Sequence, residues 1–350
     1  MNKIRIAIVG YGGMGHYHAH NIIDGNEMVE FAGAYDISPS RMDLVRTDGF
    51  HSYESMEELL SDPTVDVVTV ATPNDVHKDV CIQCMRAGKH VVCEKPVALN
   101  SAQLEEMIAV SKECGVVFTV HQNRRWDRDF NKMKKIFDDN TLGRVFRIES
   151  RVHGSRGVPG DWRNRKECGG GMMMDWGIHM LDQMFKMMGD RKVKSIYARM
   201  TNITNEECDD GFKVIVEFED DIEFHLEVGT SNFVNLPRWY MLGENGTAVM
   251  NNWTEGKIVM VSDWENREAV PVQASAGWTK TMAPRTNDTI QEYPLPEVNV
   301  TLRDFYHNVA LAIKGEATLL VTHEQMLRDM RFMEACFRSA AENRVITDFE

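Results

Sequence analysis

The 350-residue sequence lacks three features that would place it in a special class of proteins. It has no apolar run long enough to cross a bilayer, which takes about 20 residues in a helix. Its apolar N-terminal stretch, MNKIRIAIVG, is too short for a secretory signal peptide. Its seven cysteines are an odd number without the spacing of a disulfide framework, which indicates reduced thiols. We therefore expect a cytoplasmic protein.

Positive charge is also scarce, because 39 Lys and Arg stand against 53 Asp and Glu, giving a formal net charge of −14. This balance opposes binding to nucleic acid or to anionic membranes. The length favours two domains, since single cores stop growing at about 250 to 300 residues. The composition therefore predicts a two-domain globular protein whose partner is a small molecule.

The first third of the chain alternates β-branched runs with helical patterns. Continuous apolar strands between helices are typical of a parallel sheet covered on both faces, so this part predicts a doubly wound α/β domain. The expected strands are IRIAIV (4–9), VEFAGAY (29–35), VDVVTVA (65–71), HVVCEK (90–95) and VVFTV (116–120). The expected helices are 14–24, 38–46, 76–87 and 101–114.

A glycine-rich motif, GYGGMG, follows the first of these strands and opens a helix. Such glycines allow a tight turn and the close approach of a pyrophosphate, which then lies at the positive end of the helix. The motif alone is weak evidence, but its place between strand and helix is the one that dinucleotide binding requires. The predicted cofactor-binding residues here are Gly10, Gly12, Gly13, Met14 and Gly15.

Asp36 ends the second strand, about 20 residues after the last glycine, where a carboxylate can accept hydrogen bonds from both ribose hydroxyls of the adenosine. A 2′-phosphate would be repelled there, so NAD is favoured over NADP. Arg41 lies near enough to neutralise a phosphate and is included among the predicted cofactor contacts. The alternative is that Asp36 merely caps the following turn.

Polar residues also follow the next two strands, at the edge of the sheet where open α/β sheets bind ligands. They are Thr72-Pro73-Asn74 and Glu94-Lys95-Pro96. Each segment could be ordinary turn chemistry. A lysine at this edge would, however, stand beside the nicotinamide end of a bound cofactor.

The stretch GGGMMMDWGIHMLDQM (169–184) is an apolar helical pattern interrupted by Asp175, His179 and Asp182. Apolar helices exclude such groups unless something satisfies them. Asp175 and His179 are four apart and would share one helix face. The stretch alone leaves two readings open: a core helix with one satisfied histidine, or a catalytic pair of histidine and carboxylate.

No metal site is predicted. His16, His18 and His20 follow a helix start, where side chains two apart point in different directions. Cys81 and Cys84 form a C-x-x-C pair, but they lie in an amphipathic helix with no second pair, which favours structural burial.

From about residue 119 the pattern changes to longer strands, and a short acidic turn at 219–221 joins two of them as a hairpin. We expect a large, mostly antiparallel open sheet with helices, including 169–188, on one face. Residues 263–298 contain four prolines and predict a loop-rich excursion; Thr322 to Gln325 reads as a capping box. The other expected strands are 143–152 and 195–202.

GYGGMG, TPN, EKP and GGGMMMDWGIHMLD, in this order, resemble the Gfo/Idh/MocA family of NAD(P)-dependent oxidoreductases over most of the chain. The resemblance implies a Rossmann domain at 1–121 and a substrate-binding and oligomerisation α+β domain at 122–350. It also implies a homo-oligomer, dimer or tetramer, formed through the open sheet face.

The same resemblance assigns the site. It implies that Lys95, Asp175 and His179 form the catalytic group, that the Lys95-Pro96 peptide is cis, and that Arg124 contacts substrate together with that group. The further cofactor contacts that it implies are Thr72, Asn74, His77, Glu94, Lys95, Gln122, Trp162 and Arg163.

These residues predict hydride transfer between NAD(P) and a secondary hydroxyl of a sugar, inositol or glycoside. His179 would be the general base, Asp175 would orient it, and Lys95 would be the cation at the reacting oxygen or the immediate base itself. Two alternatives remain: a glycoside hydrolase or lyase that recycles its cofactor, and a non-catalytic NAD-binding sensor. The sequence does not name the substrate or its reacting hydroxyl.

Overall fold

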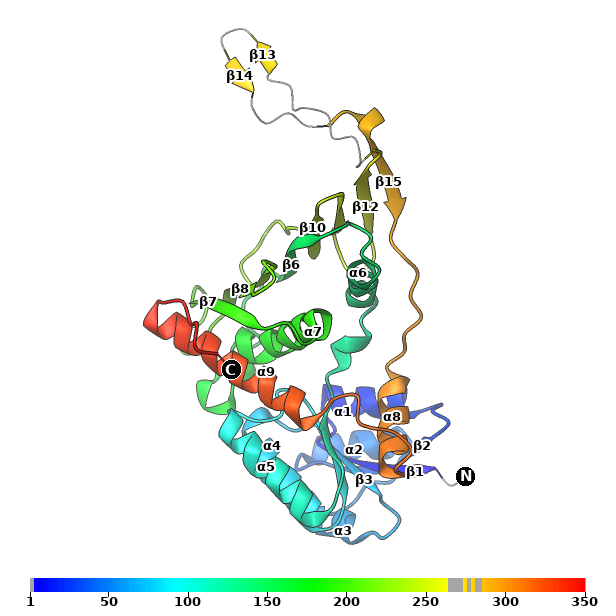
Figure 1. Ribbon diagram of the computed structural model, residues 1–350. Helices are drawn as coiled ribbons and strands as arrows, with labels where there is room; N and C mark the ends of the chain where they lie inside the picture. Colours follow the sequence, from blue (N-terminus) through cyan, green and yellow to red (C-terminus); the bar gives the residue numbers. More distant parts are fainter. Residues whose placement is uncertain (1–2, 264–272, 276–277, 281–284, 350) are drawn as a thin grey trace.

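Two large β-sheets organise the chain in the computed structural model, which describes residues 3–263, 273–275, 278–280 and 285–349 (Figure 1). The first sheet is parallel throughout, and the second is mixed and mostly antiparallel. The predicted fold class is therefore confirmed.

The parallel sheet has the strand order β2-β1-β3-β4-β5. Its central strands are apolar and buried on both faces, because helices cover the sheet on either side. All five predicted strands are present, three of them shorter than expected. They are β1 (Ile4–Val9), β2 (Val29–Tyr35), β3 (Val67–Val70), β4 (His90–Cys93) and β5 (Phe118–Val120).

The helices of this half begin and end where local signals place them. The clearest case is α5, where the Asn100 side chain accepts a hydrogen bond from Gln103 N and left-handed Gly115 (φ +66°) closes the last turn. The short helix α3 was not predicted. The elements are α1 (Gly13–Tyr17), its π-helical continuation η1 (His18–Ile23), α2 (Pro39–Thr47), α3 (Met56–Ser61), η2 (Asn74–Val76), α4 (His77–Arg86) and α5 (Ser101–Cys114).

The second sheet has eight strands in the order β15-β12-β11-β10-β6-β9-β8-β7, with β6 and β9 parallel and the other pairs antiparallel. The predicted hairpin is β8–β9, and its acidic turn is present. The strands are β6 (Val145–His153), β7 (Val193–Thr201), β8 (Gly211–Phe218), β9 (Glu223–Gly229), β10 (Trp239–Gly243), β11 (Gly246–Met250), β12 (Gly256–Val261) and β15 (Ile290–Pro294).

One face of this sheet is covered by helices, as Figure 1 shows for α6, α7 and α9. Alternate residues of β8 and β9, such as Val214 and Leu226, are fully buried on that face, and each contributes about 1.5–3 kcal/mol. The other face carries ion pairs such as Arg147–Glu223 (2.8 Å). The helices are η3 (Asn123–Trp126), α6 (Arg128–Asp138), η4 (Trp162–Asn164), η5 (Lys166–Cys168), η6 (Met173–Gly177), α7 (Ile178–Met188) and α9 (His323–Glu342).

The excursion at 263–298 is only partly described, and Pro271 and Pro284 lie outside the described residues. Its last part is not loop as predicted, because β15 pairs antiparallel with β12 and ends at Pro294 on the edge of the sheet. An edge strand tolerates proline, which removes only a donor that faces outward. The remaining described elements are a short pair, β13 (Gln273–Ser275) and β14 (Trp278–Lys280), and η7 (Asn287–Thr289).

The C-terminal segment returns to the parallel sheet. Helix α8 (Arg303–Ile313), which the prediction assigned to the second domain, packs against β2 and η1 of the first. Helix α9 contacts both halves: Ser101 of α5 donates two hydrogen bonds to Glu334 (2.7 and 2.8 Å), while α9 also packs on α7 and β7. The predicted capping box at its start is present, with Thr322 and Gln325.

No helix in the described part of the chain is both long and apolar enough to span a membrane.

Candidate active site

The glycine loop between β1 and α1 contains two glycines that the packing requires and two that leave open space. A Cβ on Gly10 (φ +93°) would lie 2.6 Å from Ala71 O, and one on Gly15 would lie 2.0 Å from Gly10 O. The chain's own packing therefore requires both. A Cβ on Gly12, in contrast, would meet no atom within 4 Å, as would one on Gly13. Open space above backbone N–H groups fits a bound pyrophosphate.

Asp36 lies at the end of β2, where the sequence predicted a ribose-binding carboxylate. Its Oδ2 accepts a hydrogen bond from Tyr11 N (2.7 Å) and its Oδ1 one from Ser38 N (2.8 Å). The carboxylate thus holds the glycine loop and caps the following turn, as one of the two predictions had it, while ribose binding by the same group stays a prediction. Arg41 is exposed in the first turn of α2.

Of the three predicted cofactor contacts after β3, one has a polar atom left for a bound molecule, and the other two bind backbone carbonyls of the protein. Thr72 Oγ1 is buried with no hydrogen-bond partner among the described residues, which fits a contact with a bound molecule. Asn74 is buried and donates to Gly169 O (3.0 Å), tying this edge to the loop before η6. His77 is fully buried, with its two ring nitrogens 2.9 Å from Thr72 O and Pro96 O. It can shape a cofactor site only through the backbone that it holds.

Glu94 also points inward. Its Oε1 lies 2.7 Å from His18 Nε2 and 2.8 Å from His121 Nδ1, and His18 Nδ1 in turn contacts the Tyr306 hydroxyl (2.8 Å). Burial would raise the pKa of the Glu94 carboxyl, but the two histidines outweigh it and hold that pKa well below its usual range. This buried network joins β4, β5, η1 and α8 behind Lys95.

Lys95 and Asp175, 80 positions apart in the sequence, meet at the carboxyl edge of the parallel sheet. Lys95 Nζ donates to Asp175 Oδ1 (2.8 Å) and to Asp175 O (3.1 Å), and the Lys95–Pro96 peptide is cis, as the family resemblance implied. Burial alone would raise the pKa of the Asp175 carboxyl, but Lys95, Arg163 and Arg124 lower it. A deprotonated Asp175 keeps the Lys95 ammonium in place.

His179 lies one turn further along the same helical segment and is 4% exposed. Its Nδ1 is buried and has no hydrogen-bond partner among the described residues, so the predicted orienting contact from Asp175 does not form. The reason is that the Asp175 carboxylate is already taken up by Lys95 and, at 3.7 Å, by Arg163. Burial, Lys95 and Arg124 lower the pKa of His179 well below its usual range.

Asp182, the third polar residue of this stretch, has a structural partner instead. Its carboxylate accepts two hydrogen bonds from Arg125 Nε (2.8 and 3.0 Å), and both side chains are at most 3% exposed. The helix thus combines the two readings that the sequence left open: Asp175 and His179 face the site, and Asp182 is satisfied in the core.

Three side chains, Arg124, Trp176 and Trp253, stack in a row next to His179 and form what we call the aromatic wall. The Arg124 guanidinium lies 4.0 Å from the Trp176 ring centre, and the rings of Trp176 and His179 are 6.0 Å apart. Trp253, from the turn between β11 and β12, lies 6.1 Å from Trp176 and is 43% exposed. Gln122, at the predicted domain crossing, is buried with its Oε1 unpartnered among the described residues.

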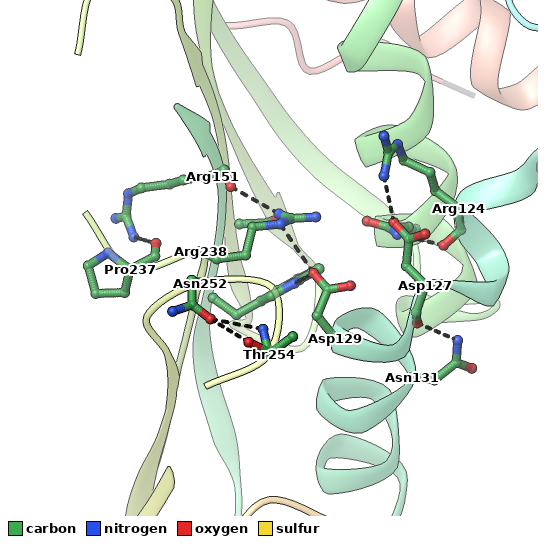
Figure 2. A network of polar contacts seen from close by, with 12 residues as sticks. Arg124, Asp127, Asp129, Asn131, Arg151, Pro237, Arg238, Asn252 and Thr254 are labelled. Atoms are coloured by element: carbon green, nitrogen blue, oxygen red, sulfur yellow. Dashed lines mark hydrogen bonds and ion pairs between the residues drawn. The ribbon is translucent and has the colours of Figure 1, made fainter. Parts of the chain in front are cut away.

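Arg238 packs on Trp253 of this aromatic wall. Its guanidinium lies 4.5 Å from the Trp253 ring centre, and its Nε is 3.2 Å from Asp129 Oδ2 (Figure 2). Asp129 also accepts from Trp239 Nε1 (2.8 Å). Burial lowers the pKa of Arg238 to about 10, even though Asp129 opposes that effect. Figure 2 also shows the ion pair between Arg124 of η3 and Asp127, the residue directly before α6.

Trp162 and Arg163 lie together in η4, with the guanidinium 4.4 Å from the indole centre. Arg163 Nη1 donates to Asp161 (2.6 Å), and its Nε approaches Asp175. Both side chains are half-buried, and Arg163 links the pair to Asp175; contact with a bound cofactor stays a prediction.

Sequence reasoning missed Trp253, Arg238 and the histidine partners of Glu94. Arg238 and Trp253 belong to no motif, and His18, which the sequence analysis considered only as a metal ligand, meets Glu94 across 76 positions of the chain. The one available signal was HQNRRWD (121–127), whose His121 was passed over in favour of the following Gln and Arg.

Two sequence families match the chain. Residues 4–122 match the family described as "Oxidoreductase family, NAD-binding Rossmann fold", and residues 130–249 match the "GFO/IDH/MocA C-terminal domain". The two matches cover the parallel sheet, the second sheet from β6 to β10 with most of β11, and both Lys95 and Asp175.

Relatives and solved structures agree with these matches. A crystal structure of an NAD-binding protein from Listeria innocua superposes with a TM-score of 0.93 at 40% identity, over 99% of this chain and 100% of that one. The scyllo-inositol 2-dehydrogenase (NADP+) IolW of Bacillus subtilis is 28% identical over 99% of this chain and 96% of its own length. The myo-inositol 2-dehydrogenase of Thermotoga maritima is 34% identical over 58% of this chain and 60% of its own.

Proposed function

Because this chain belongs to the Gfo/Idh/MocA family of oxidoreductases, we propose that it is a dehydrogenase acting on a secondary hydroxyl of an inositol or a sugar, with NAD as its cofactor. The observation that carries the proposal is the contact between Lys95 and Asp175 beside neutral His179. It brings a cation and a proton acceptor together at the sheet edge where a Rossmann domain presents its nicotinamide.

The proposed chemistry follows from charge. An alcohol loses a hydride only as its hydroxyl proton leaves, so the site must accept a proton and stabilise negative charge on oxygen. His179 is neutral and can take the proton; the Lys95 ammonium can bind the same oxygen. The bound nicotinamide supplies the hydride acceptor. Asp175 acts as a positioning residue, because it contacts Lys95 and not His179.

Several groups support the proposed cofactor. The open space at Gly12 fits a dinucleotide along the sheet edge, and so do Thr72 Oγ1 and Gln122 Oε1, which have no hydrogen-bond partner within the described ranges. Asp36 at the ribose position favours NAD over NADP, since a 2′-phosphate would meet a carboxylate. The IolW relative is named for NADP+, so this preference needs its own measurement.

For the substrate, the aromatic wall favours a ring with an apolar face. Inositols and pyranoses carry axial C–H groups that pack on an indole, while their hydroxyls reach groups such as Lys95 and Arg124. Trp253 is the exposed member of the wall and is proposed as the platform for this face. Two relatives that are named as inositol dehydrogenases support the choice of a cyclic polyol.

We further propose a cytoplasmic homo-oligomer. All seven cysteines are free thiols, which fits a reducing compartment. The helix-free face of the second sheet, with its ion pairs of Arg147 and Arg151 to glutamates, is the proposed contact between copies.

The first test mixes the protein with NAD and a panel of inositols, aldoses and glycosides, and follows the formation of NADH by its ultraviolet absorbance. One polyol class should be oxidised, and Lys95→Met should lower kcat about 10²- to 10³-fold, the cost of losing one charge-stabilising group. Lys112→Met, on the exposed side of α5, is the matched control and should leave the rate unchanged.

Two other outcomes would contradict the proposal. A glycoside cleaved without net NADH would mean that the cofactor is recycled in the site. NAD binding without turnover of any panel member would indicate a sensor.

A further inference from the structure

Helix α1 and its continuation η1 contain three histidines, whose side chains point in two directions. His18 points inward to Glu94, whereas His16 and His20 lie at the surface and both face Asp48, at the end of α2. His18 is two positions from both His16 and His20 and therefore points in a different direction. His16 and His20 are four apart, which places them on one face.

Four possible metal ligands meet at this surface cluster. His20 Nε2 is 3.2 Å and His16 Nε2 is 3.5 Å from Asp48 Oδ2, and the Tyr11 hydroxyl is 3.4 Å from His20 Nε2. In a tetrahedral zinc site with bonds of 2.0–2.1 Å, neighbouring ligand atoms are about 3.3–3.4 Å apart. These three separations are therefore close to the edges of a coordination tetrahedron, while the fourth, from the Tyr11 hydroxyl to Asp48 Oδ2, is a shorter hydrogen bond of 2.9 Å.

The buried cluster of His18, Glu94 and His121 makes the contrast clear. Its donor atoms are 2.7 and 2.8 Å apart, which are hydrogen-bond lengths, and His18 is further held by Tyr306. No ion fits between atoms so close. At the surface cluster, by comparison, three groups approach the one oxygen Asp48 Oδ2, the third being the Tyr11 hydroxyl at 2.9 Å.

The two imidazoles of the surface cluster also lie together, with ring centres 4.3 Å apart and planes 32° apart. At this distance one ring nitrogen from each imidazole can donate its lone pair to one shared ion. Nitrogen donors select a transition ion such as Zn²⁺ over Mg²⁺ or Ca²⁺, which prefer oxygen.

We propose that His16, His20 and Asp48 bind one divalent transition ion, with the Tyr11 hydroxyl or a water in the fourth position. The side chains are 42%, 35% and 15% exposed in that order, so an ion can enter from solvent. Tyr11 belongs to the glycine loop, and its backbone N–H donates to Asp36. The ion would therefore clip the glycine loop and α1 to the end of α2.

The experiment uses the full chain, freed of metal with a chelator and dialysed. Zn²⁺ is titrated by calorimetry, and Co²⁺ by its visible absorption, whose intensity reports tetrahedral coordination. We expect one ion per chain, a rise in Tm on binding, and a loss of affinity of at least about tenfold in both Asp48→Asn and His20→Gln. Asp48→Asn keeps the shape of the side chain, so its fold should survive.

His307→Gln is the matched control, because His307 is an exposed histidine on α8 outside the cluster. It should bind Zn²⁺ like the unsubstituted protein. The proposal is overturned if the unsubstituted chain binds no ion, or if Asp48→Asn and His20→Gln, folded by circular dichroism, bind Zn²⁺ with unchanged affinity.

Discussion

The two halves of the candidate site hold their polar groups by different means. On the parallel-sheet side, backbone geometry does it: Gly10 and Gly15 fit only as glycine, and Lys95 stands at the end of β4. On the antiparallel side, side chains hold one another: Arg124 packs on Trp176, and Arg238 on Trp253. The first arrangement suits a fixed cofactor, and the second can be changed residue by residue to suit a substrate.

The two halves also contribute different charged and titratable groups to the site. The half with the glycine loop contributes Lys95, while the other half contributes Asp175, which fixes that lysine, and His179, which burial keeps neutral. We infer that neither half alone can carry out the proposed reaction. Substitutions in the two halves should therefore separate loss of chemistry from loss of binding.

The largest effect is expected at His179. His179→Gln should lower kcat about 10²- to 10⁴-fold, the usual cost of losing a general base, and change NAD affinity little. Because the pKa of His179 is lowered, the base is deprotonated down to a pH below about 6.5, and kcat/KM should fall only beneath that pH. Rates measured from pH 5 to 9 would contradict the assignment if the acid limb lay at or above 6.5.

Asp182, three residues further, should affect stability rather than chemistry. Asp182→Asn leaves buried Arg125 without its partner, and we expect a loss of about 3 kcal/mol in the free energy of unfolding, the low end for a broken buried pair. The cost is at the low end because Asp329 can ionise in its place; burial and Asp182 now raise the pKa of Asp329 well above its usual range.

Urea denaturation measures this effect. Asp329→Asn is the matched control and should cost far less, since burial and Asp182 raise the pKa of the Asp329 carboxyl and so favour its neutral form. Equal losses in the two variants would show that the Arg125–Asp182 pair is not what stabilises this helix.

Gly12 tests the opposite half. Gly12→Ala should weaken NAD binding about tenfold, or about 1.4 kcal/mol, and leave Tm unchanged, because its Cβ meets no protein atom within 4 Å and would occupy space needed by the cofactor. Gly15→Ala should instead prevent stable folding. Calorimetric NAD titration and thermal melting check both variants; unchanged NAD affinity in Gly12→Ala would place the pyrophosphate elsewhere.

The smallest effect is expected at Trp253. Trp253→Leu should raise the substrate KM about fivefold, which corresponds to about 1 kcal/mol of aromatic contact, with little change in kcat. Phe146→Leu on β6 is the control, since Phe146 is 40% exposed and Trp253 is 43% exposed. A fall in kcat without a change in KM would show that Trp253 acts in the hydride-transfer step and not in substrate binding.

Much of this could be predicted from local sequence. The five parallel strands, the glycine loop, the acidic hairpin and the capping box of α9 each depend on neighbours in the chain, so periodicity and spacing revealed them. The short strand β15 escaped prediction, because an edge strand with a proline carries little apolar alternation.

The sequence by itself determined the elements and the residue types that chemistry needs: a glycine loop, Lys95 after a buried strand, and polar residues on an apolar helix. Only the tertiary structure decided their partners. It gave Asp175 to Lys95 instead of His179, buried Glu94 between two histidines, and joined His16 and His20 to Asp48. The physical reason is that these contacts join segments far apart in the chain, and a charged group pairs with whichever partner the packed elements bring within reach.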